Sequence, residues 1–437
     1  MKTEEFAKRR QRLMKRIGKH AIAIVSSAEE LPRSRDVNYP FRQNSDFWYL
    51  SGFNEPEALL ILLPNREEGE YVMFNRERDR DKEIWEGYRA GQKGVKANFG
   101  VDQAFPIDSL DEMLPRFLEE RKTLYYGLGS DTIDDMAVVE WIKSIPGFHR
   151  GAAKIPTLAD LNPILHDLRL IKSSAEISVM KQAAKISGDA HCRAMQSAKP
   201  GFNEQFIEGE FLHAIYQGGA KEFAYPPIIA SGENACILHY TANDQVLQDG
   251  DLLLIDAGCE LENYASDITR TFPVSGQFTK AQAAIYDLVL AAQLAAIEKV
   301  KPGNYWNEPH DAAVQVLTQG LVDLGLLKGS VKDNVKAETY KKFYMHKTGH
   351  WLGLDVHDVG RYEEKGMPQT FKPGMVLTVE PGIYVNPDLK GIAKKWRGIG
   401  IRIEDDVLVT KKGCEVLTHH APKERKAIEA LMRAEYG

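Results

Sequence analysis

The sequence is poor in cysteine and has no long apolar runs. Its four cysteines, at positions 192, 236, 259 and 414, include no CxxC pair. This pattern argues against both a disulfide framework and a thiolate zinc site, and it favours a reducing cytoplasm. No stretch reaches the roughly 20 apolar residues that a membrane span needs. The apolar run 21–25 is too short for a signal-peptide core. We therefore expect a cytoplasmic protein with no membrane partner.

The charge balance also excludes some partners. With 56 basic and 62 acidic residues, the net charge is −6, and no basic block stands out. This distribution argues against nucleic acid or an anionic membrane surface as a partner. The chain has 437 residues, of which 43% are hydrophobic and 27% charged. That composition suits a globular protein, and that length suggests two domains.

Residues 1–170 are predicted to form an α/β domain. Short apolar runs predict strands at 21–27, 46–53, 58–64, 71–76 and 123–129, and two amphipathic segments predict helices at 107–121 and 134–145. No cluster of catalytic residue types lies in this part of the chain. The boundary is placed near a helix start, where Ser173 and Glu176 have the spacing of a capping box.

Residues 171–437 contain the pattern of a diverged internal repeat. The tripeptide Lys-Pro-Gly occurs at 199–201 and again at 301–303, each time between two predicted helices. Later in each half, a glycine-led apolar strand ends in a carboxylate: "GDLLLID" ends at Asp256 and "GMVLTVE" ends at Glu380. Two halves related by an approximate two-fold axis would place these carboxylates at related positions facing a shared interior.

Five residues form a candidate metal site. A charged group at the end of a buried strand is costly unless it is paired or coordinates a metal ion. Four carboxylates and one imidazole suit manganese or cobalt, with zinc also open. They are too many for a single tetrahedral zinc but suit two bridged ions roughly 3.5–4 Å apart. The candidates are Asp256, Asp267, His350, Glu380 and Glu404.

Each candidate has a simpler explanation when taken alone. A single acid near a strand end is usually a solvated residue, and a single histidine is more often packed or exposed than a ligand. The combination in matched apolar strands favours the metal site. The segment "HKTGHWLGLDVHD" adds His346 and His357, and "CILHY" adds His239.

Long stretches of the chain resemble bacterial-type aminopeptidase P, also called Xaa-Pro aminopeptidase. The similar segments of the second half are "LIDAGCELENYASDITRTFPVSGQFT", "HWLGLDVHDVG", "LTVEPGIYV" and "GIGIRIEDDVLVT"; further ones are "YPFRQNSDFWYLSGFNEPEALLIL" and "SGENACILHYTAND". The resemblance implies an α/β N-terminal domain, residues 1–170, and an α+β C-terminal domain, residues 171–437. The latter would have the pseudo-two-fold "pita-bread" fold of creatinase, prolidase and methionine aminopeptidase.

The resemblance implies a ligand set for two manganese ions. Asp256 matches a ligand of one metal only, and His350 and Glu380 match ligands of the other. Asp267 and Glu404 match the bridging carboxylates. Glu380 is also expected to carry a proton from the attacking water to the leaving nitrogen.

Other site residues are also implied by this resemblance. His239 and His357 match histidines that line the substrate site and stabilise the reacting carbonyl. His346 lies near the site without being a ligand, and Tyr384 matches a further family position; both are expected to bind substrate. Arg402 resembles a residue that holds the acidic cluster in place, as partners of metal ligands often do.

Two positions of the first domain match residues near the substrate site. These are Asp36 and Trp85, and in relatives the residue matching Trp85 reaches in from a neighbouring subunit. The resemblance therefore implies a homo-oligomer, a dimer or tetramer built through the first domain. Lys347 departs from the family pattern, because many relatives have glycine there.

The predicted activity is release of the N-terminal residue from peptides with proline at position two. Attack by a hydroxide held between the metal ions would break the Xaa-Pro bond. One alternative is a prolidase, which cuts Xaa-Pro dipeptides and needs a basic group for the substrate carboxylate. Another is a non-catalytic pita-bread module that binds peptides. A two-metal phosphoesterase is not supported, because the sequence has no Gly-rich phosphate loop or arginine cluster.

Overall fold

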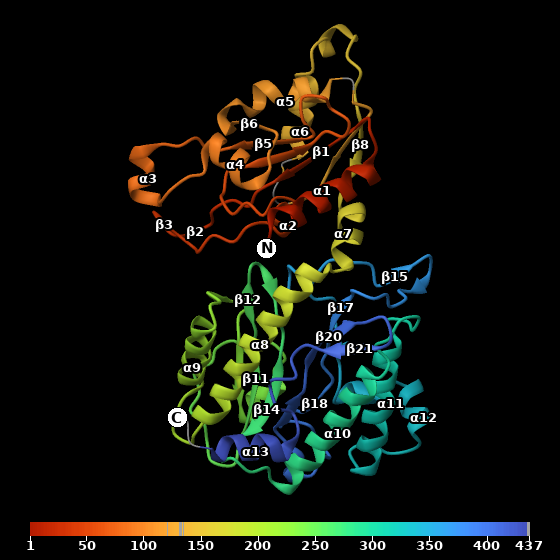
Figure 1. Cartoon of the computed structure of the whole chain (residues 1–437). Coiled ribbons are helices and arrows are strands. Elements are labelled where there is room, and N and C mark those ends of the chain that lie inside the picture. The colour runs from red at the N-terminus through yellow and green to blue at the C-terminus, as the bar shows by residue number, and fades with distance from the viewer. Residues whose placement is uncertain (120, 131–132, 134, 435–437) are drawn as a thin grey trace. The chain divides into compact units, whose positions relative to one another are not determined.

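The computed structural model describes residues 1–119, 121–130, 133 and 135–434. The chain divides into two compact units, Met1–Arg169 and Leu170–Gly437, which are described separately (Figure 1). Within the described residues, none of the helices has the length and apolar character needed to cross a membrane.

The first unit is an α/β domain around a mixed six-stranded sheet of order β6-β5-β4-β1-β7-β8. The central strand β1 runs antiparallel to β4 and parallel to β7. The strands are β1 (Ala21–Ser26), β4 (Leu59–Leu62), β5 (Tyr71–Asn75), β6 (Gln103–Pro106), β7 (Thr123–Tyr126) and β8 (Thr157–Asp160). The helices are α1 (Thr3–Ile17), α2 (Ser45–Ser51), α3 (Arg80–Glu86), α4 (Gly91–Phe99), α5 (Leu110–Leu118), α6 (Asp135–Lys143) and α7 (Asn162–Leu170), and a small hairpin joins β2 (Pro32–Ser34) to β3 (Val37–Asn38).

One predicted strand of this unit is wrong. Residues 46–53 were expected to be extended, but α2 occupies most of them. The side chain of Asn44 caps this helix by accepting hydrogen bonds from the backbone N–H groups of Asp46 and Phe47. Gly52, with φ of 64°, ends it in the left-handed conformation. The two caps outweigh the aromatic, strand-like composition. The other four predicted strands correspond to β1, β4, β5 and β7.

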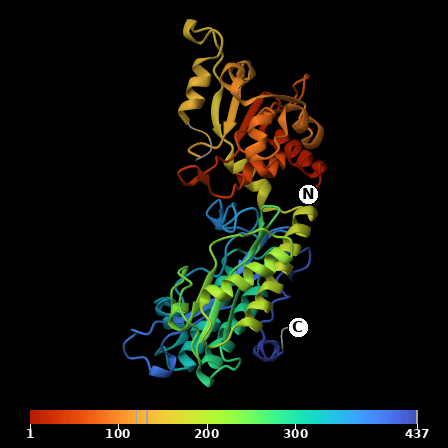
Figure 2. The same cartoon turned by 90° about the vertical axis from the view of Figure 1, so that its left-hand side faces the viewer.

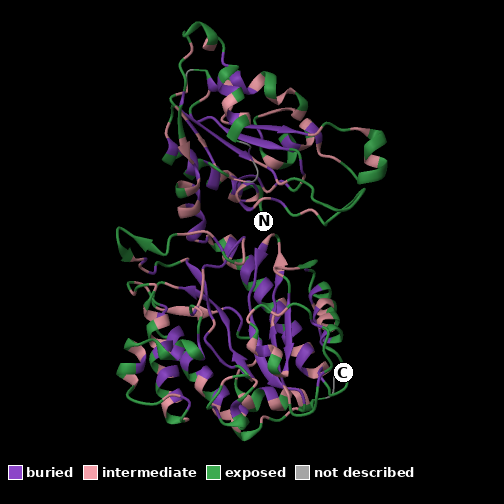
Figure 3. Ribbon diagram, turned by 180° about the vertical axis from the view of Figure 1, so that it is seen from behind, coloured by how far each residue is buried: buried purple, intermediate pink, exposed green. Residues whose placement is uncertain are grey.

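The second unit surrounds its strands with helices. The helices are α8 (Ser174–Ser197), α9 (Glu204–Gln217), α10 (Lys280–Ile297), α11 (Glu308–Asp323), α12 (Val331–Lys336) and α13 (Arg425–Arg433). Helix α8 begins at the predicted capping box of Ser173 and Glu176, and it runs along the strands (Figures 1 and 2). The strands themselves are largely buried (Figure 3).

The strands of this unit form several short antiparallel sheets. The main ones have the orders β10-β11-β14, β17-β20-β21 and β18-β19. Their bounds are β10 (Ile228–Ser231), β11 (Leu252–Asp256), β14 (Thr269–Pro273), β17 (Val376–Val379), β18 (Gly382–Val385), β19 (Ile399–Arg402), β20 (Asp405–Val409) and β21 (Cys414–Val416).

The internal repeat is visible in backbone geometry. Gly201 and Gly303 end the two Lys-Pro-Gly turns with φ of 90° and 91°. Their N–H groups donate hydrogen bonds to the carbonyls of Leu247 (2.9 Å) and Phe371 (3.2 Å), which precede the two glycine-led strands. The second unit is therefore an α+β domain with two similar halves, as the sequence pattern predicted.

The apolar pattern of the sequence predicts one long strand at 375–385 and another at 400–410, but each is broken in the middle. Residues 375–385 form β17 and β18 in different sheets, and the break falls at Glu380 and Pro381. Proline has no N–H to donate to a ladder, so a strand tends to stop there. Residues 400–410 form β19 and β20, with the break at Ile403 and Glu404. Both glutamates therefore stand at strand ends.

The connection between Asp256 and Asp267 is more ordered than a turn. It contains a hairpin of β12 (Cys259–Leu261) and β13 (Tyr264–Ala265). After this hairpin the chain returns antiparallel to β11, and Thr269 lies opposite Asp256 in the register. Asp267 precedes this strand by two residues, which brings the two aspartates to one end of the sheet.

Candidate active site

Strand pairing brings Glu404 beside the two aspartates. The backbone N–H of Glu404 donates to the carbonyl of Thr269 at 3.1 Å. The hydroxyl of Thr269 donates to Oε2 of the same glutamate at 2.5 Å. Since Thr269 is also the register partner of Asp256, one residue links both carboxylates. The Glu404 side chain is 1% exposed, so its orientation depends on these contacts.

A second set of backbone hydrogen bonds places His350 next to Glu380. Thr378 donates its N–H to the carbonyl of His350 at 2.9 Å, and Glu380 donates its N–H to the carbonyl of Thr348 at 2.8 Å. This close approach requires glycine at position 349, because an added Cβ would lie 2.0 Å from the Thr378 carbonyl oxygen. The two segments therefore lie side by side.

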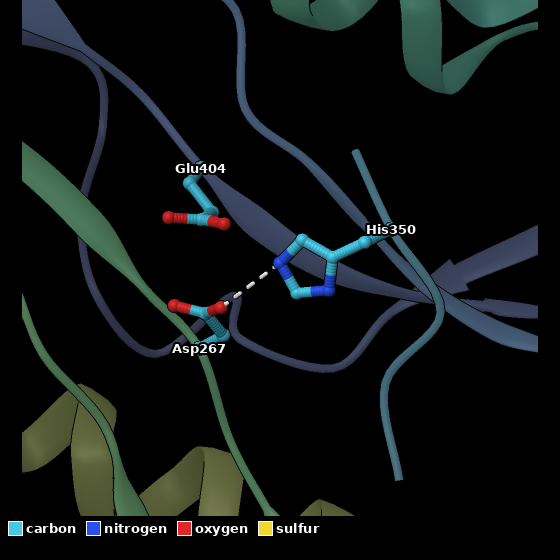
Figure 4. Close-up of side chains that lie close together, drawn as sticks. All are labelled: Asp267, His350 and Glu404. Carbon is cyan, nitrogen blue, oxygen red and sulfur yellow. Dashed lines mark ion pairs between the residues drawn. The ribbon is translucent and has the colours of Figure 1, made fainter. Parts of the chain in front are cut away.

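Asp267, His350 and Glu404 converge on one point (Figure 4). One ligand atom from each lies within 4.8 Å of the others. The Nε2 atom of His350 is 3.3 Å from Oδ2 of Asp267 and 3.8 Å from Oε1 of Glu380. Carboxylate oxygens with one imidazole nitrogen are a donor set that suits divalent ions. These side chains can therefore hold a divalent metal ion.

The electrostatics of the cluster also fit a bound cation. Burial, followed by the charges of Asp267 and Asp256, raises the pKa of Glu380 to about 7, despite the opposing effect of His350 and Arg402. Burial and the same aspartates raise the pKa of Glu404 well above its usual range. Carboxylates crowded in this way repel one another in their charged forms, and a divalent cation would offset that repulsion.

Arg402 bonds to several members of the acidic cluster. Its Nη2 donates to Oδ2 of Asp256 at 2.6 Å, and its Nη1 donates to the Tyr384 hydroxyl at 2.9 Å. Its Nε donates to the hydroxyl of Thr269 at 3.1 Å. Burial lowers the pKa of Arg402, but Tyr384 and the surrounding carboxylates outweigh this effect, so the pKa lies well above its ordinary value. The guanidinium therefore stays charged and fixes the Asp256 carboxylate.

The cluster lies in a cavity of about 650 Å³. Nine site residues predicted from the sequence contribute to its lining: Asp256, Asp267, His350, Glu380, Glu404, His239, His346, His357 and Arg402. Apolar walls come from other parts of the second unit, among them Pro226, Leu238, Val356 and Tyr362.

The histidines of the cavity differ in their charge. Burial lowers the pKa of His350, but the hydrogen bond and charge of Asp267 outweigh it and raise the pKa to about 9. Burial and Arg402 lower the pKa of His346 to about 4. Burial and His350 also lower the pKa of His357, whose ring lies 4.3 Å from that of His350. Near neutral pH, His346 and His357 are therefore neutral imidazoles, each with one N–H to donate.

Tyr384 does not lie on the cavity surface, although it was predicted to bind substrate. It is 1% exposed, and its hydroxyl bonds to Nε2 of His346 at 2.9 Å and to Arg402. Its place behind these two residues suits a supporting contact, and direct binding of substrate stays a prediction.

Asp36 and Trp85 belong to the first unit. Asp36 is exposed in the turn between β2 and β3, and Trp85 lies in α3 with 88% of its surface exposed. Neither lines the described cavity of the second unit. Their part in substrate binding stays a prediction.

Sequence reasoning missed Tyr225. Its hydroxyl lies 2.7 Å from Oδ1 of Asp256 and 2.5 Å from Oδ1 of Asp267. A phenol has one proton, so it donates to one of these carboxylates at a time. Burial and both aspartates raise its pKa well above the usual value. The strand that follows Tyr225 pairs Ile228 with Asp256, and this pairing, which the sequence alone does not reveal, brings the tyrosine to the aspartates.

The two-half fold and the acidic cluster with its histidine define a metallohydrolase of the pita-bread class. Two family models match the chain. The model described as metallopeptidase family M24 matches residues 178–411, and the model of the aminopeptidase P N-terminal domain matches residues 6–125. The chain therefore belongs to metallopeptidase family M24 and carries the N-terminal domain of aminopeptidase P.

Individual relatives agree with this assignment. The chain is 44% identical to the Xaa-Pro aminopeptidase of Escherichia coli over 433 residues, covering 99% of this chain and 98% of the relative. The structure of the aminopeptidase PepP of Pseudomonas aeruginosa matches with a TM-score of 0.97 at 52% identity, covering 99% and 98% of the two chains. The E. coli aminopeptidase P with the inhibitor Pro-Leu matches with a TM-score of 0.95 at 44% identity, covering 99% and 98%.

Proposed function

We propose that this enzyme is an Xaa-Pro aminopeptidase, which releases the N-terminal residue from peptides with proline at position two. The observation that carries the proposal is the convergence of Asp267, His350 and Glu404 in the lining of a cavity of about 650 Å³. Further support comes from the full-length similarity to an Xaa-Pro aminopeptidase and from the structure of a similar protein bound to Pro-Leu.

The cofactor we propose is a pair of divalent ions, most suitably Mn²⁺. The donor set supports it, because oxygen-rich ligands with one imidazole suit this ion. Such ions supply acidified water and polarise a carbonyl oxygen. The residues that would hold these ions are Asp256, Asp267, His350, Glu380 and Glu404.

We propose three roles for protein side chains in the reaction: proton transfer, stabilisation of the oxyanion and support of a metal ligand. Glu380 accepts the proton of the attacking water and passes it to the leaving nitrogen, and its place beside His350 in the floor of the cavity supports this role. His239 and His357 line the cavity and donate N–H bonds to the oxyanion that develops on the carbonyl. Arg402 keeps Asp256 in place through the bond of 2.6 Å.

Recognition of proline depends on shape rather than on a backbone hydrogen bond. The amide nitrogen of proline carries no hydrogen, so the site has no donor to detect there. The apolar lining residues suit the ring of proline; they include Pro226, Leu238, Val356 and Tyr362. The free amino terminus of the substrate needs an acidic partner, and Asp256 or Asp36 is proposed for it.

Assembly and location are also proposed. The exposed side chains of Ile84, Trp85 and Tyr88 on and beside α3 support a homo-oligomer formed through the first unit, as a dimer or a tetramer. All four cysteines are free thiols, which supports a cytoplasmic location.

The proposal is tested with matched peptides. The protein is treated with a chelator, reloaded with Mn²⁺ and assayed with Xaa-Pro-Xaa tripeptides, Xaa-Pro dipeptides and Xaa-Ala-Xaa tripeptides. We expect metal-dependent release of the first residue from Xaa-Pro-Xaa and little from Xaa-Ala-Xaa. Activity on dipeptides alone would favour a prolidase. Inactivity on all three after reloading would favour a peptide-binding module.

A further inference from the structure

Lys347 lines the cavity of the candidate active site. It follows His346 directly, and Nδ1 of that histidine lies 2.7 Å from the Lys347 carbonyl oxygen. This contact fixes the backbone at the cavity wall. The Lys347 side chain is exposed, unlike the buried or half-buried acids of the cluster. The ammonium group is therefore accessible to solvent at the lining of the cavity.

The ammonium group of Lys347 has no ion-pair partner among the residues that the structure describes, because no carboxylate oxygen lies within 4.0 Å of it. Glu338 is near enough to interact with its charge, but that glutamate pairs with Lys341 at 2.6 Å. Burial and then the charge of Lys347 lower the pKa of His310 to about 4, so this neighbour supplies no negative charge either. The ammonium group thus has room for an anion from outside.

Arg402 cannot play the same part. It is the other lysine or arginine among the described residues that line the cavity, and it is 3% exposed. All its side-chain nitrogens already donate to Asp256, Tyr384 and Thr269. Of the lysine and arginine side chains among the described lining residues, Lys347 is therefore the one whose charge is exposed to a negatively charged substrate group.

We propose that Lys347 determines specificity by binding the C-terminal carboxylate of short substrates, which makes the enzyme favour free-acid tripeptides of the type Xaa-Pro-Xaa. This inference rests on the proposed function, because it assumes that Xaa-Pro peptides enter the cavity. It adds a preference for peptide length and for the state of the carboxyl end.

The position of the charge selects the tripeptide over the dipeptide. In a dipeptide the carboxylate is on the proline itself, next to the scissile bond and close to the four acids of the floor. One more residue moves the carboxylate up to about 3.3–3.6 Å further from them. The flexible four-carbon stem of lysine lets the ammonium group follow it at the exposed side.

The test compares a free-acid tripeptide with its C-terminal amide. The Mn²⁺-loaded wild type is expected to show a kcat/KM about two- to fivefold higher for the acid, the size typical of an exposed ion pair. The difference should lie in KM, because the contact is equally present in ground and transition states. In Lys347→Gln the preference should disappear, whereas Lys347→Arg should retain it. Raising the ionic strength should reduce it.

The matched control is Lys342→Gln, an exposed lysine that is not part of the lining. It should keep the wild-type preference. Equal kcat/KM for acid and amide in the wild type, or a preference that persists in Lys347→Gln, would overturn the inference while leaving the proposed function intact. If the Mn²⁺-loaded wild type hydrolyses neither peptide, the proposed function fails, and this inference fails with it.

Discussion

Lys172 and Asp358 form a buried ion pair across 186 residues of sequence. The Nζ atom of Lys172 lies 2.8 Å from Oδ2 of Asp358, and both side chains are 1% exposed. Asp358 follows His357 directly, and its N–H donates to the carbonyl of Trp351 at 2.9 Å. Gly353 leaves the space for this pair, because an added Cβ would lie 2.2 Å from the Asp358 carboxylate. The pair therefore anchors the turn that carries His357.

Breaking this pair from one side is expected to destabilise the protein strongly. In Lys172→Met, the buried Asp358 carboxylate loses the ammonium group of Lys172, and removal of one partner of a buried ion pair typically costs about 3–5 kcal/mol. Urea unfolding monitors the loss. Removing both charges in Lys172→Met/Asp358→Leu should recover a large part of it. The control is Lys181→Met, which breaks an exposed pair with Glu415 and should change stability by less than about 1 kcal/mol. A loss of that small size in Lys172→Met would contradict the prediction.

Removal of a bridging ligand should abolish activity without unfolding the chain. Glu404→Ala deletes a carboxylate that converges with Asp267 and His350, and it also removes a buried repulsion within the cluster. We expect hydrolysis below detection, with bound metal measured by elemental analysis reduced to one ion or none. Circular dichroism and the unfolding midpoint report on the fold. Retained activity would remove Glu404 from the site.

Tyr225 is expected to support the cluster rather than to react. Tyr225→Phe keeps the ring but removes the hydroxyl that lies between Asp256 and Asp267. Loss of such a partner typically lowers metal affinity or activity by about 10–100-fold. The measurement is a Mn²⁺ titration of activity, in which the midpoint should move to higher concentration. The exposed Tyr216→Phe serves as the control. An unchanged midpoint in Tyr225→Phe would show that the hydroxyl is dispensable.

The metal cluster could be predicted from sequence because its ligands stand at the ends of apolar strands. Asp256 and Glu380 close matching glycine-led runs, and that local pattern survives in the folded chain. The sequence pattern did not predict the breaks after β17 and β19. Each break depends on which sheets the two parts of the segment join, and the periodicity within one segment does not contain that information. Pro381 was the one local sign of such a break.

Contacts between segments that are distant in the sequence could not be predicted either. Tyr225 meets the aspartates, and Lys172 meets Asp358, through pairings that no spacing along the chain reveals. In the first unit, the aromatic composition of residues 46–53 predicts a strand, but the caps at Asn44 and Gly52 make residues 45–51 a helix. Each of these errors reflects a neighbour in space or a cap that overrides the composition of the segment.

The first unit should show a pH dependence that depends on Asp46. Burial raises the pKa of this carboxyl, but Arg169 (2.8 Å) and His166 (3.3 Å) lower it to about 2 from the ordinary 3.8. Below pH 3.8 the unfolded chain binds the proton first, so the stability due to Asp46 is lost as the pH falls toward 2. Urea unfolding should therefore find Asp46→Asn weaker than wild type by about 2 kcal/mol at pH 6 and by about 1 kcal/mol at pH 3. Asp287→Asn, in an exposed pair with Arg425, should show a difference below about 1 kcal/mol at both values. An Asp46→Asn deficit that stays constant between pH 6 and pH 3 would show that the charge of Asp46 does not stabilise the unit.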